Sequence, residues 1–217
     1  MRSSRNLRVV LHSLRRALEP DLKRGGASSF IVTKGDLVHL SSSSLVWIDV
    51  EEFVDRARRA VSLSSSGRRV EGISEYRRAA ALYRGEYLED ELYSDWCLFE
   101  RERLKEVCIS LSLRMASILT EMGDLAQASD VYRAALKVDG GREEIHRELM
   151  RLLWKSGRRD EALRQYESCS RILREELGVG PASETEALYA SIAVEAQTVP
   201  GDLGTDTPEA PTGLLDS

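Results

Sequence analysis

A motif of glycine, alanine and tyrosine recurs in this chain at constant spacing, and it restricts the fold more than any other feature of the sequence. Copies begin at Gly123 and Gly157, 34 residues apart, with alanine five residues and tyrosine nine residues after the glycine. An earlier copy begins at Gly67 and has glycine at the alanine position. The small and aromatic positions of the three copies are Gly72 and Tyr76, Ala128 and Tyr132, and Ala162 and Tyr166.

This spacing is the period of tetratricopeptide repeats, in which each repeat is a pair of helices. Glycine ends the first helix, the small residue lets the second helix approach it closely, and the aromatic residue fills the gap between neighbouring repeats. Gly67 precedes Gly123 by 56 residues, so the first interval carries an insertion of about 22 residues. We therefore expect a mainly α fold, with an unrelated helical bundle as the alternative. Asp49 and Glu52 are spaced to form a capping box where this helical part begins.

The first 48 residues have a different pattern. Leu7, Leu11, Leu14 and Leu18 fall on one side of a predicted helix, which Pro20 ends. Two short β-like runs, 30–32 and 37–40, follow with a turn between them, which predicts a β-hairpin. One helix and one hairpin therefore precede the helical repeats.

Charge is unevenly distributed over the chain, whose net charge is −5. Residues 1–48 hold eight Arg or Lys and three acids, whereas residues 200–217 hold four acids and no base. A basic head on an acidic body indicates that nucleic acid, if bound, meets the head. The acidic tail is rich in Gly, Pro and Thr, which predicts disorder.

Five stretches of the chain, which together span about residues 49–192, resemble the bacterial transcriptional activator domain of actinomycete-type antibiotic regulatory proteins. They are DVEEF (49–53), ALYRGEYLED (81–90), DWCLFERERL (95–104), GREEIHRELMRLLWKSGRRDEALRQYESCSRILREELGVGP (141–181) and ETEALYASI (184–192). The resemblance implies a tetratricopeptide-like domain that follows a winged helix of the response-regulator type. It divides the chain into the C-terminal part of a winged helix (1–48), the activator domain (49–196) and a disordered tail (197–217).

In this interpretation the first helix is the recognition helix, and the hairpin is the wing. A complete head has a sheet and two helices before the recognition helix, and here these elements are missing. Because an isolated helix of this length is marginal in water, we expect the chain to be a fragment of a longer regulator. The alternative is a reduced protein that has lost autonomous DNA binding.

The candidate DNA-binding residues are basic side chains of the predicted recognition helix and wing. Arginine pairs bidentately with guanine edges and with phosphate oxygens, so several arginines on one helix face can form a docking surface. A solvated basic face without a ligand is the alternative, and Arg15 lies near enough to the leucines to be structural. The candidates are Arg5, Arg8, His12, Arg15, Arg16 and Lys34.

Other chemistry finds little support in the sequence. The three histidines are scattered without metal-ligand spacing, and no nucleotide-binding or nucleophile motif occurs. We therefore expect no enzymatic activity, cofactor or metal. The three cysteines form no C-x-x-C pair, which favours buried structural thiols. With no signal peptide or membrane-spanning run, a cytoplasmic protein without membrane association is expected.

The sequence thus predicts a transcriptional regulator whose partners are duplex DNA, through the head, and a protein or second copy, through the repeats. A stand-alone protein-interaction module without DNA binding is the second hypothesis, and a small-molecule sensor is the third. Four aromatic residues could line a groove in the repeats, but packing between helices is favoured for them. They are Tyr83, Tyr87, Trp96 and Trp154.

Overall fold

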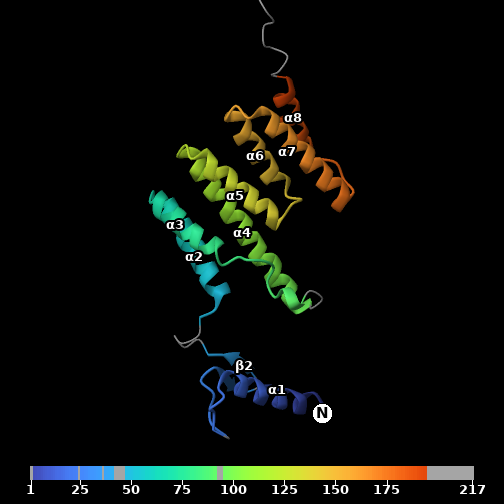
Figure 1. Ribbon diagram of the computed structural model, residues 1–217. Coiled ribbons are helices and arrows are strands. Elements are labelled where there is room, and N and C mark those ends of the chain that lie inside the picture. Colours follow the sequence, from blue (N-terminus) through green and yellow to red (C-terminus); the bar gives the residue numbers. More distant parts are fainter. Residues whose placement is uncertain (1, 24, 36, 42–46, 92–94, 195–217) are drawn as a thin grey trace, which may run out of the picture. The chain divides into compact units, whose positions relative to one another are not determined.

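The computed structural model describes residues 2–23, 25–35, 37–41, 47–91 and 95–194, and confirms a mainly α fold (Figure 1). The chain forms two compact units, Met1–Arg84 and Gly85–Ser217. The predicted tail, 197–217, lies outside the described residues. The first unit contains α1 (Arg2–Leu18), β1 (Ile31–Lys34), β2 (Leu37–Leu40), α2 (Asp49–Ser65) and α3 (Arg69–Ala80). The second contains η1 (Glu89–Glu91), α4 (Asp95–Glu121), α5 (Leu125–Val138), α6 (Glu143–Lys155), α7 (Arg159–Ile172), the π-helical η2 (Leu173–Leu177) and α8 (Ser183–Val194).

The three repeat glycines each follow the first helix of a pair, as the sequence predicts. Gly67, Gly123 and Gly157 have φ of +83°, +83° and +74°, a left-handed conformation that costs glycine little. After each glycine, the next backbone N–H bonds a carbonyl five residues back, which caps the helix. These bonds run from Arg68 to Leu63, Asp124 to Leu119 and Arg158 to Leu153, each at 2.9 Å. The chain therefore reverses in the same way at α2–α3, α4–α5 and α6–α7.

The small residues lie where the two helices of a pair touch. Ala128 and Ala162 are fully buried. At Gly72 the approach is closer still, because an added Cβ would overlap Ser64 Oγ and lie 3.0 Å from the Ala60 carbonyl oxygen. The small residue predicted at this position therefore lies at a contact between the helices, and α2 and α3 meet nearly backbone to backbone at Gly72.

The tyrosines of the second and third copies join one pair to the next element. Tyr132 on α5 is 3% exposed, and its burial, with the nearby Glu148 of α6, raises its pKa to about 12. Tyr166 on α7 stacks on Tyr189 of α8, with ring centroids 4.1 Å apart. The last helix thus takes the place of a further repeat at this end of the array.

Side chains distant in the sequence hold both ends of α8. Glu143 accepts hydrogen bonds from the backbone N–H of Ala182 (2.8 Å) and from the Thr185 hydroxyl (2.7 Å). A carboxylate at this position also compensates the positive end of the helix dipole. Arg159 donates to the carbonyls of Ile192 and Ala193, both at 2.9 Å. The final helix is therefore fixed to α6 at its start and to α7 at its end.

The capping box predicted for α2 is wrong. The residue before the helix is Ile48, and it makes no side-chain capping bond. Glu52 instead pairs with Arg56 at 2.5 Å, one turn further along the helix. Because an arginine was available on the same face, the carboxylate pairs with it instead of bonding the backbone.

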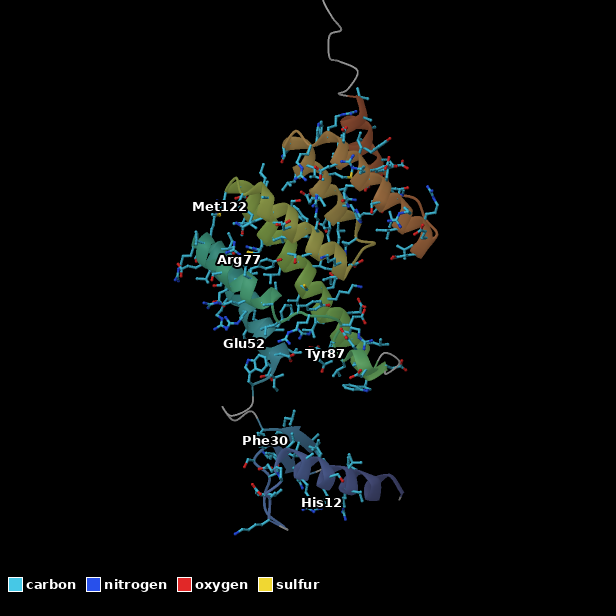
Figure 2. The ribbon with its side chains drawn as sticks, viewed as in Figure 1. His12, Phe30, Glu52, Arg77, Tyr87 and Met122 are labelled. Atoms are coloured by element: carbon cyan, nitrogen blue, oxygen red, sulfur yellow. The ribbon has the colours of Figure 1, made fainter. Side chains whose placement is uncertain are left out.

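A buried arginine organises the segment that the sequence shows as an insertion. Arg101 of α4 is 6% exposed and donates to the backbone carbonyls of Tyr87 (3.1 Å) and Leu88 (3.2 Å). Its Nε also lies 3.6 Å from a carboxylate oxygen of Glu86. The stretch from Glu86 to Leu88 within the insertion is therefore held against α4, near the labelled Tyr87 (Figure 2).

A buried histidine joins the α5–α6 connection to α7. The Nε2 of His146 lies 2.8 Å from the Gly140 carbonyl oxygen, and its Nδ1 lies 2.6 Å from Nε2 of Gln165. A carbonyl only accepts, so Nε2 carries the proton and Nδ1 accepts from the Gln165 amide. Burial lowers the pKa of His146, because it disfavours the charged ring.

Replacing Gly72 with alanine should destabilise the chain by about 1–3 kcal/mol, because the added methyl overpacks the α2–α3 contact. Urea unfolding followed by circular dichroism measures the change. Ser64→Ala in the same chain removes one of the two obstructions, so the double variant should recover part of the loss. Equal stability of Gly72→Ala and the parent chain would contradict the close approach.

Stability should fall as the pH drops below about 6.5, because the unfolded state then binds a proton that folded His146 resists. The slope reaches at most about 1.4 kcal/mol per pH unit until the folded pKa is passed. Urea unfolding at pH 7.5, 6.5 and 5.5 tests this, with His146→Gln as the variant. The variant should show a flatter profile in this range, and an unchanged slope would show that another group is responsible.

Candidate nucleic-acid interface

The head consists of α1 and a small antiparallel hairpin, in which Ile31 pairs with Leu40 and Lys34 with Leu37. Between them, the Glu19 carboxylate accepts hydrogen bonds from the Ser28 hydroxyl and the Ser29 backbone N–H. These bonds lower the pKa of Glu19 and keep it charged. This contact could not be predicted from the sequence, since nothing in the local pattern links residues nine apart across a loop. It fixes the path of the chain from helix to hairpin.

Arg15 is tied to the hairpin. Its Nη2 lies 2.6 Å from Thr33 Oγ1 and 3.4 Å from the Ile31 carbonyl oxygen, while its Nε is buried without a hydrogen-bond partner. The guanidinium thus joins α1 to β1 and helps to cover Ile31, the one buried side chain among the described residues of the head. Of the two roles left open by the sequence, the structural one accounts for these bonds.

Three other predicted residues form a row on the outside of α1. Arg8, His12 and Arg16 are four residues apart, so they share one helix face, and all three are exposed. Arg5 belongs to the same helix, but its side chain lies outside the described part. Lys34 is exposed at the end of β1. The structure therefore brings Arg8, His12 and Arg16 together and places Lys34 on the other element of the head.

Among the residues that the structure describes, these cations have no acidic partner, in contrast to many arginines of the helical domain. Within the described part of the chain, no carboxylate lies at ion-pairing distance from Arg8, His12, Arg16 or Lys34. Arginines from α2 to α7, by contrast, commonly lie within 4.0 Å of a carboxylate. These paired residues include Arg56, Arg58, Arg59, Arg68, Arg78, Arg103, Arg133, Arg142, Arg151, Arg158 and Arg171.

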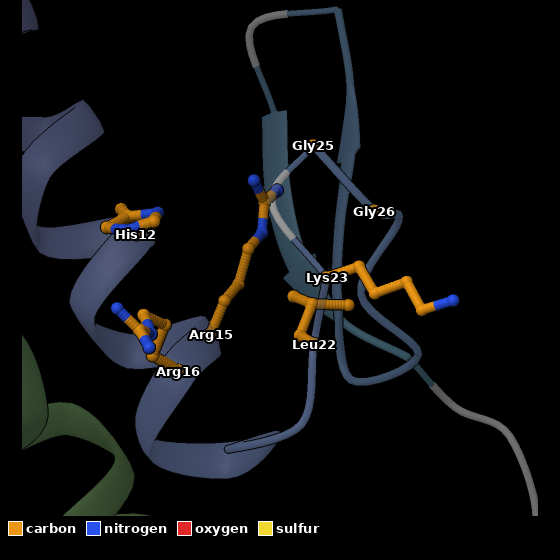
Figure 3. A pocket seen from close by; sticks show the side chains of 7 residues that line it. All are labelled: His12, Arg15, Arg16, Leu22, Lys23, Gly25 and Gly26. Atoms are coloured by element: carbon orange, nitrogen blue, oxygen red, sulfur yellow. The ribbon is translucent and has the colours of Figure 1, made fainter.

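A basic pocket of about 410 Å³ lies where α1 meets the following loop (Figure 3). Figure 3 shows His12 and Arg16 along the helix, and Arg15 extending from the helix toward the loop at Gly25. No carboxylate is among its described lining residues. Such a lining suits an anionic group. The residues that line it are His12, Arg15, Arg16, Leu22, Lys23, Gly25 and Gly26.

The apolar side of α1 is uncovered in this structure. Leu7, Leu14 and Leu18 are 52%, 43% and 44% exposed, and Leu37 of the hairpin is 72% exposed. Leu7, Leu14 and Leu18 belong to the leucines that the sequence places on one face of the helix. A head of one helix and one hairpin thus leaves a hydrophobic face open beside its row of cations.

Among the described residues, no three His, Cys, Asp or Glu side chains are grouped so that they could hold a metal ion. Burial raises the pKa of Cys108 and Cys169 to about 11, so both thiols stay protonated and unreactive. Among the described helices, none is long and apolar enough to cross a membrane.

The sequence favours packing between helices for four aromatic residues. The structure agrees with this prediction only in part. Tyr83 lies 5.6 Å from Phe53, ring centroid to ring centroid, and Trp154 is half-buried. Trp96, in contrast, is 70% exposed. The prediction that Trp96 packs between helices is therefore wrong.

Three antiparallel helical pairs, each reversed at a glycine, define a protein of the tetratricopeptide-like class. Residues 48–193 match the bacterial transcriptional activator domain family. The chain belongs to that family, which confirms the resemblance noted in the sequence.

Its relatives are regulatory proteins. The chain is 30% identical over 145 residues to the regulatory protein AfsR of Streptomyces griseus, which covers 67% of this chain and 15% of that protein. It is 28% identical over 209 residues to AfsR of Streptomyces coelicolor, covering 96% and 20%. The chain thus spans about a fifth or less of the length of these relatives.

A solved structure has a similar fold. It is that of Mycobacterium tuberculosis EmbR in complex with a low-affinity phosphopeptide, with a TM-score of 0.65 and 21% identity. The match covers 87% of this chain and 50% of that one. The match therefore extends beyond the family segment, 48–193, and includes part of the head.

Proposed function

We propose that this chain is a fragment of a transcriptional regulator, in which the head binds duplex DNA and the helical domain controls it. The observation that carries the proposal is the row of cations on α1, for which no carboxylate partner lies among the described residues. In a chain whose other arginines usually pair with acids, such cations mark a surface suited to an external anion.

The roles of the predicted residues follow from their positions. Arg8, His12 and Arg16 can face the major groove together, where arginine pairs with guanine edges or with phosphates. Arg5 extends the same row in sequence. Lys34 on the hairpin is suited to a backbone phosphate, as the wing of such heads is. Arg15 acts as a positioning residue, because its guanidinium holds α1 against β1.

We further propose that additional polypeptide completes the head. The exposed leucines of α1 resemble one half of a domain core, and a helix with such a face gains stability only when another element covers it. The helical domain would then act through self-association or contact with another protein, since repeat arrays commonly bind proteins.

Loss of the α1 cations should weaken DNA binding and its salt dependence together. Arg8→Ala with Arg16→Ala removes up to two phosphate or base contacts, so affinity for a duplex pool from the source genome should fall about tenfold or more. The slope of log affinity against log salt should decrease by about 2 if both contacts are to phosphate. Fluorescence anisotropy between 50 and 200 mM salt, with the native polypeptide that contains this chain, measures both quantities.

The matched control is Arg133→Ala with Arg171→Ala, which removes the same charge from exposed sites of the helical domain. It should bind DNA nearly as the parent does. An equal loss in both double variants would mean that only net charge matters, and the assignment to α1 would fail. Absence of salt-dependent binding by the parent would favour the stand-alone interaction module.

The intact mass of the native protein tests the completion of the head. We expect a mass well above the 24.3 kDa of this chain, with the extra residues supplying the elements that cover the leucines. Mass spectrometry of the protein purified from its source cells gives the answer. A native mass of 24.3 kDa would contradict the proposed completion.

A further inference from the structure

The basic pocket between α1 and the following loop contains basic side chains that the proposed DNA contacts do not use. His12 and Arg16 belong to the row on α1, whereas Arg15 and Lys23 line the pocket from outside that row. Figure 3 shows Arg15 extending from the helix toward the loop at Gly25. The pocket volume of about 410 Å³ falls within the roughly 300–1,000 Å³ of small-molecule sites. A concave site of this size suits a free ligand, because duplex DNA meets side chains that protrude from a surface.

The acids nearest to the pocket in the sequence do not pair with its cations. In the part of the chain that the structure describes, no carboxylate lies at ion-pairing distance from the two arginines or the lysine of the pocket. Glu19 is occupied by its hydrogen bonds with Ser28 and Ser29. Together with Asp21 it lines a neighbouring hollow, which shares Lys23 with the basic pocket. Among the described residues, the positive charge of the pocket is therefore left to an external anion.

Backbone carbonyls at this end of α1 oppose an anion less than they do at an open helix end. Carbonyls without a partner carry the negative charge of a helix C-terminus. Here the Glu19 carbonyl accepts from the Leu22 N–H at 3.0 Å, and the Lys23 carbonyl accepts from the Gly26 N–H at 2.8 Å. A Cβ on Gly26 would lie 3.0 Å from the same Lys23 oxygen, so this turn is tight. The loop thus engages its own carbonyls beside the pocket.

The lining also restricts the kind of ligand. Leu22 is the one large apolar side chain among the described lining residues, and none of them is aromatic. The pocket therefore offers no stacking surface for a nucleobase or another flat ring. Several basic side chains around one pocket suit a compact ligand with more than one negative charge. Guanidinium and ammonium groups both bind phosphate oxygens well.

We propose that the pocket binds a free anion with two linked phosphate groups, and that the bound anion competes with DNA for His12 and Arg16. The competition rests on the proposed DNA binding, whereas the anion site does not. His12 and Arg16 contact the phosphate oxygens from the helix. Lys23 contributes from the loop, since its flexible four-carbon stem lets the ammonium follow the anion. Arg15 adds positive charge while its hydrogen bonds stay with the hairpin.

Inorganic pyrophosphate is the probe, titrated into the full chain by calorimetry at constant ionic strength and without divalent cations. We expect a Kd below about 1 mM. Arg16→Gln should weaken binding about three- to tenfold, because it removes one charged contact. Arg8→Gln is the matched control, since Arg8 is an exposed arginine of the same row that does not line the pocket. Lys23→Gln, outside the row, should weaken binding as Arg16→Gln does, and Lys23→Arg should retain it.

Three results would overturn the anion site. The first is the absence of pyrophosphate binding by the parent chain. The second is an equal loss in Arg8→Gln and Arg16→Gln, which would show general attraction to a basic helix. The third is unchanged binding in both Arg16→Gln and Lys23→Gln, which would place the anion elsewhere.

The competition is measured with duplex DNA and the native polypeptide that contains this chain. Pyrophosphate at ten times its Kd should raise the apparent Kd for DNA about tenfold above the effect of NaCl at the same ionic strength. Lys23→Gln should reduce this difference, and no difference in the parent would contradict the competition. A protein that binds pyrophosphate but no DNA would contradict the DNA proposal and leave the anion site standing, so the two proposals fail independently.

Discussion

Close contact between two helices at one small residue underlies each repeat of this chain. At Gly72 the two helices meet nearly backbone to backbone, and Ala128 and Ala162, at the same position of the other two pairs, are fully buried. When helices pack so closely, dispersion contacts increase and little space remains for a large side chain. The tyrosine four residues later then has a defined place on the outside of the pair. For Tyr132 and Tyr166, that place lies against α6 and α8. One local contact thus sets both the pair and its stacking on the next element.

Charged side chains from distant positions in the sequence fix the inserted loop and the ends of α8, which the repeat contacts alone do not hold. Arg101 fixes the inserted loop, Glu143 caps the start of α8, and Arg159 binds carbonyls at its end. In each case a charged group meets backbone atoms that have no partner within their own element, and charge-assisted bonds are the stronger kind. Cutting any of these contacts would leave unpaired backbone groups near the core. The third helical pair is therefore followed by an ordered helix, α8.

The sequence predicts features that depend on local spacing, and it misses contacts between residues that only the fold brings together. The glycine, small residue and tyrosine act within one helical pair, so their spacing alone predicts the pairs correctly. The same periodicity places Trp96 and Phe99 in a helix with buried neighbours, but it cannot say which face another element covers. Arg15 shows the same limit in the head, since its partners Thr33 and Ile31 lie on a strand that only the fold brings near. The row of Arg8, His12 and Arg16 is visible in the sequence, whereas the absence of carboxylates near its described members is not.

The distribution of ion pairs shows which charges are neutralised within the chain, and the net charge alone does not. The helical domain is rich in arginine, but most of these side chains are held by carboxylates one turn away or on a neighbouring helix, which cancels their field at a short distance. The acids that follow Trp96 on α4 are paired in the same way, Glu100 with Arg103, Glu102 with Lys105 and Glu106 with Arg142. The DNA binding proposed for the head therefore relies on α1, where no such pair occurs among the described residues.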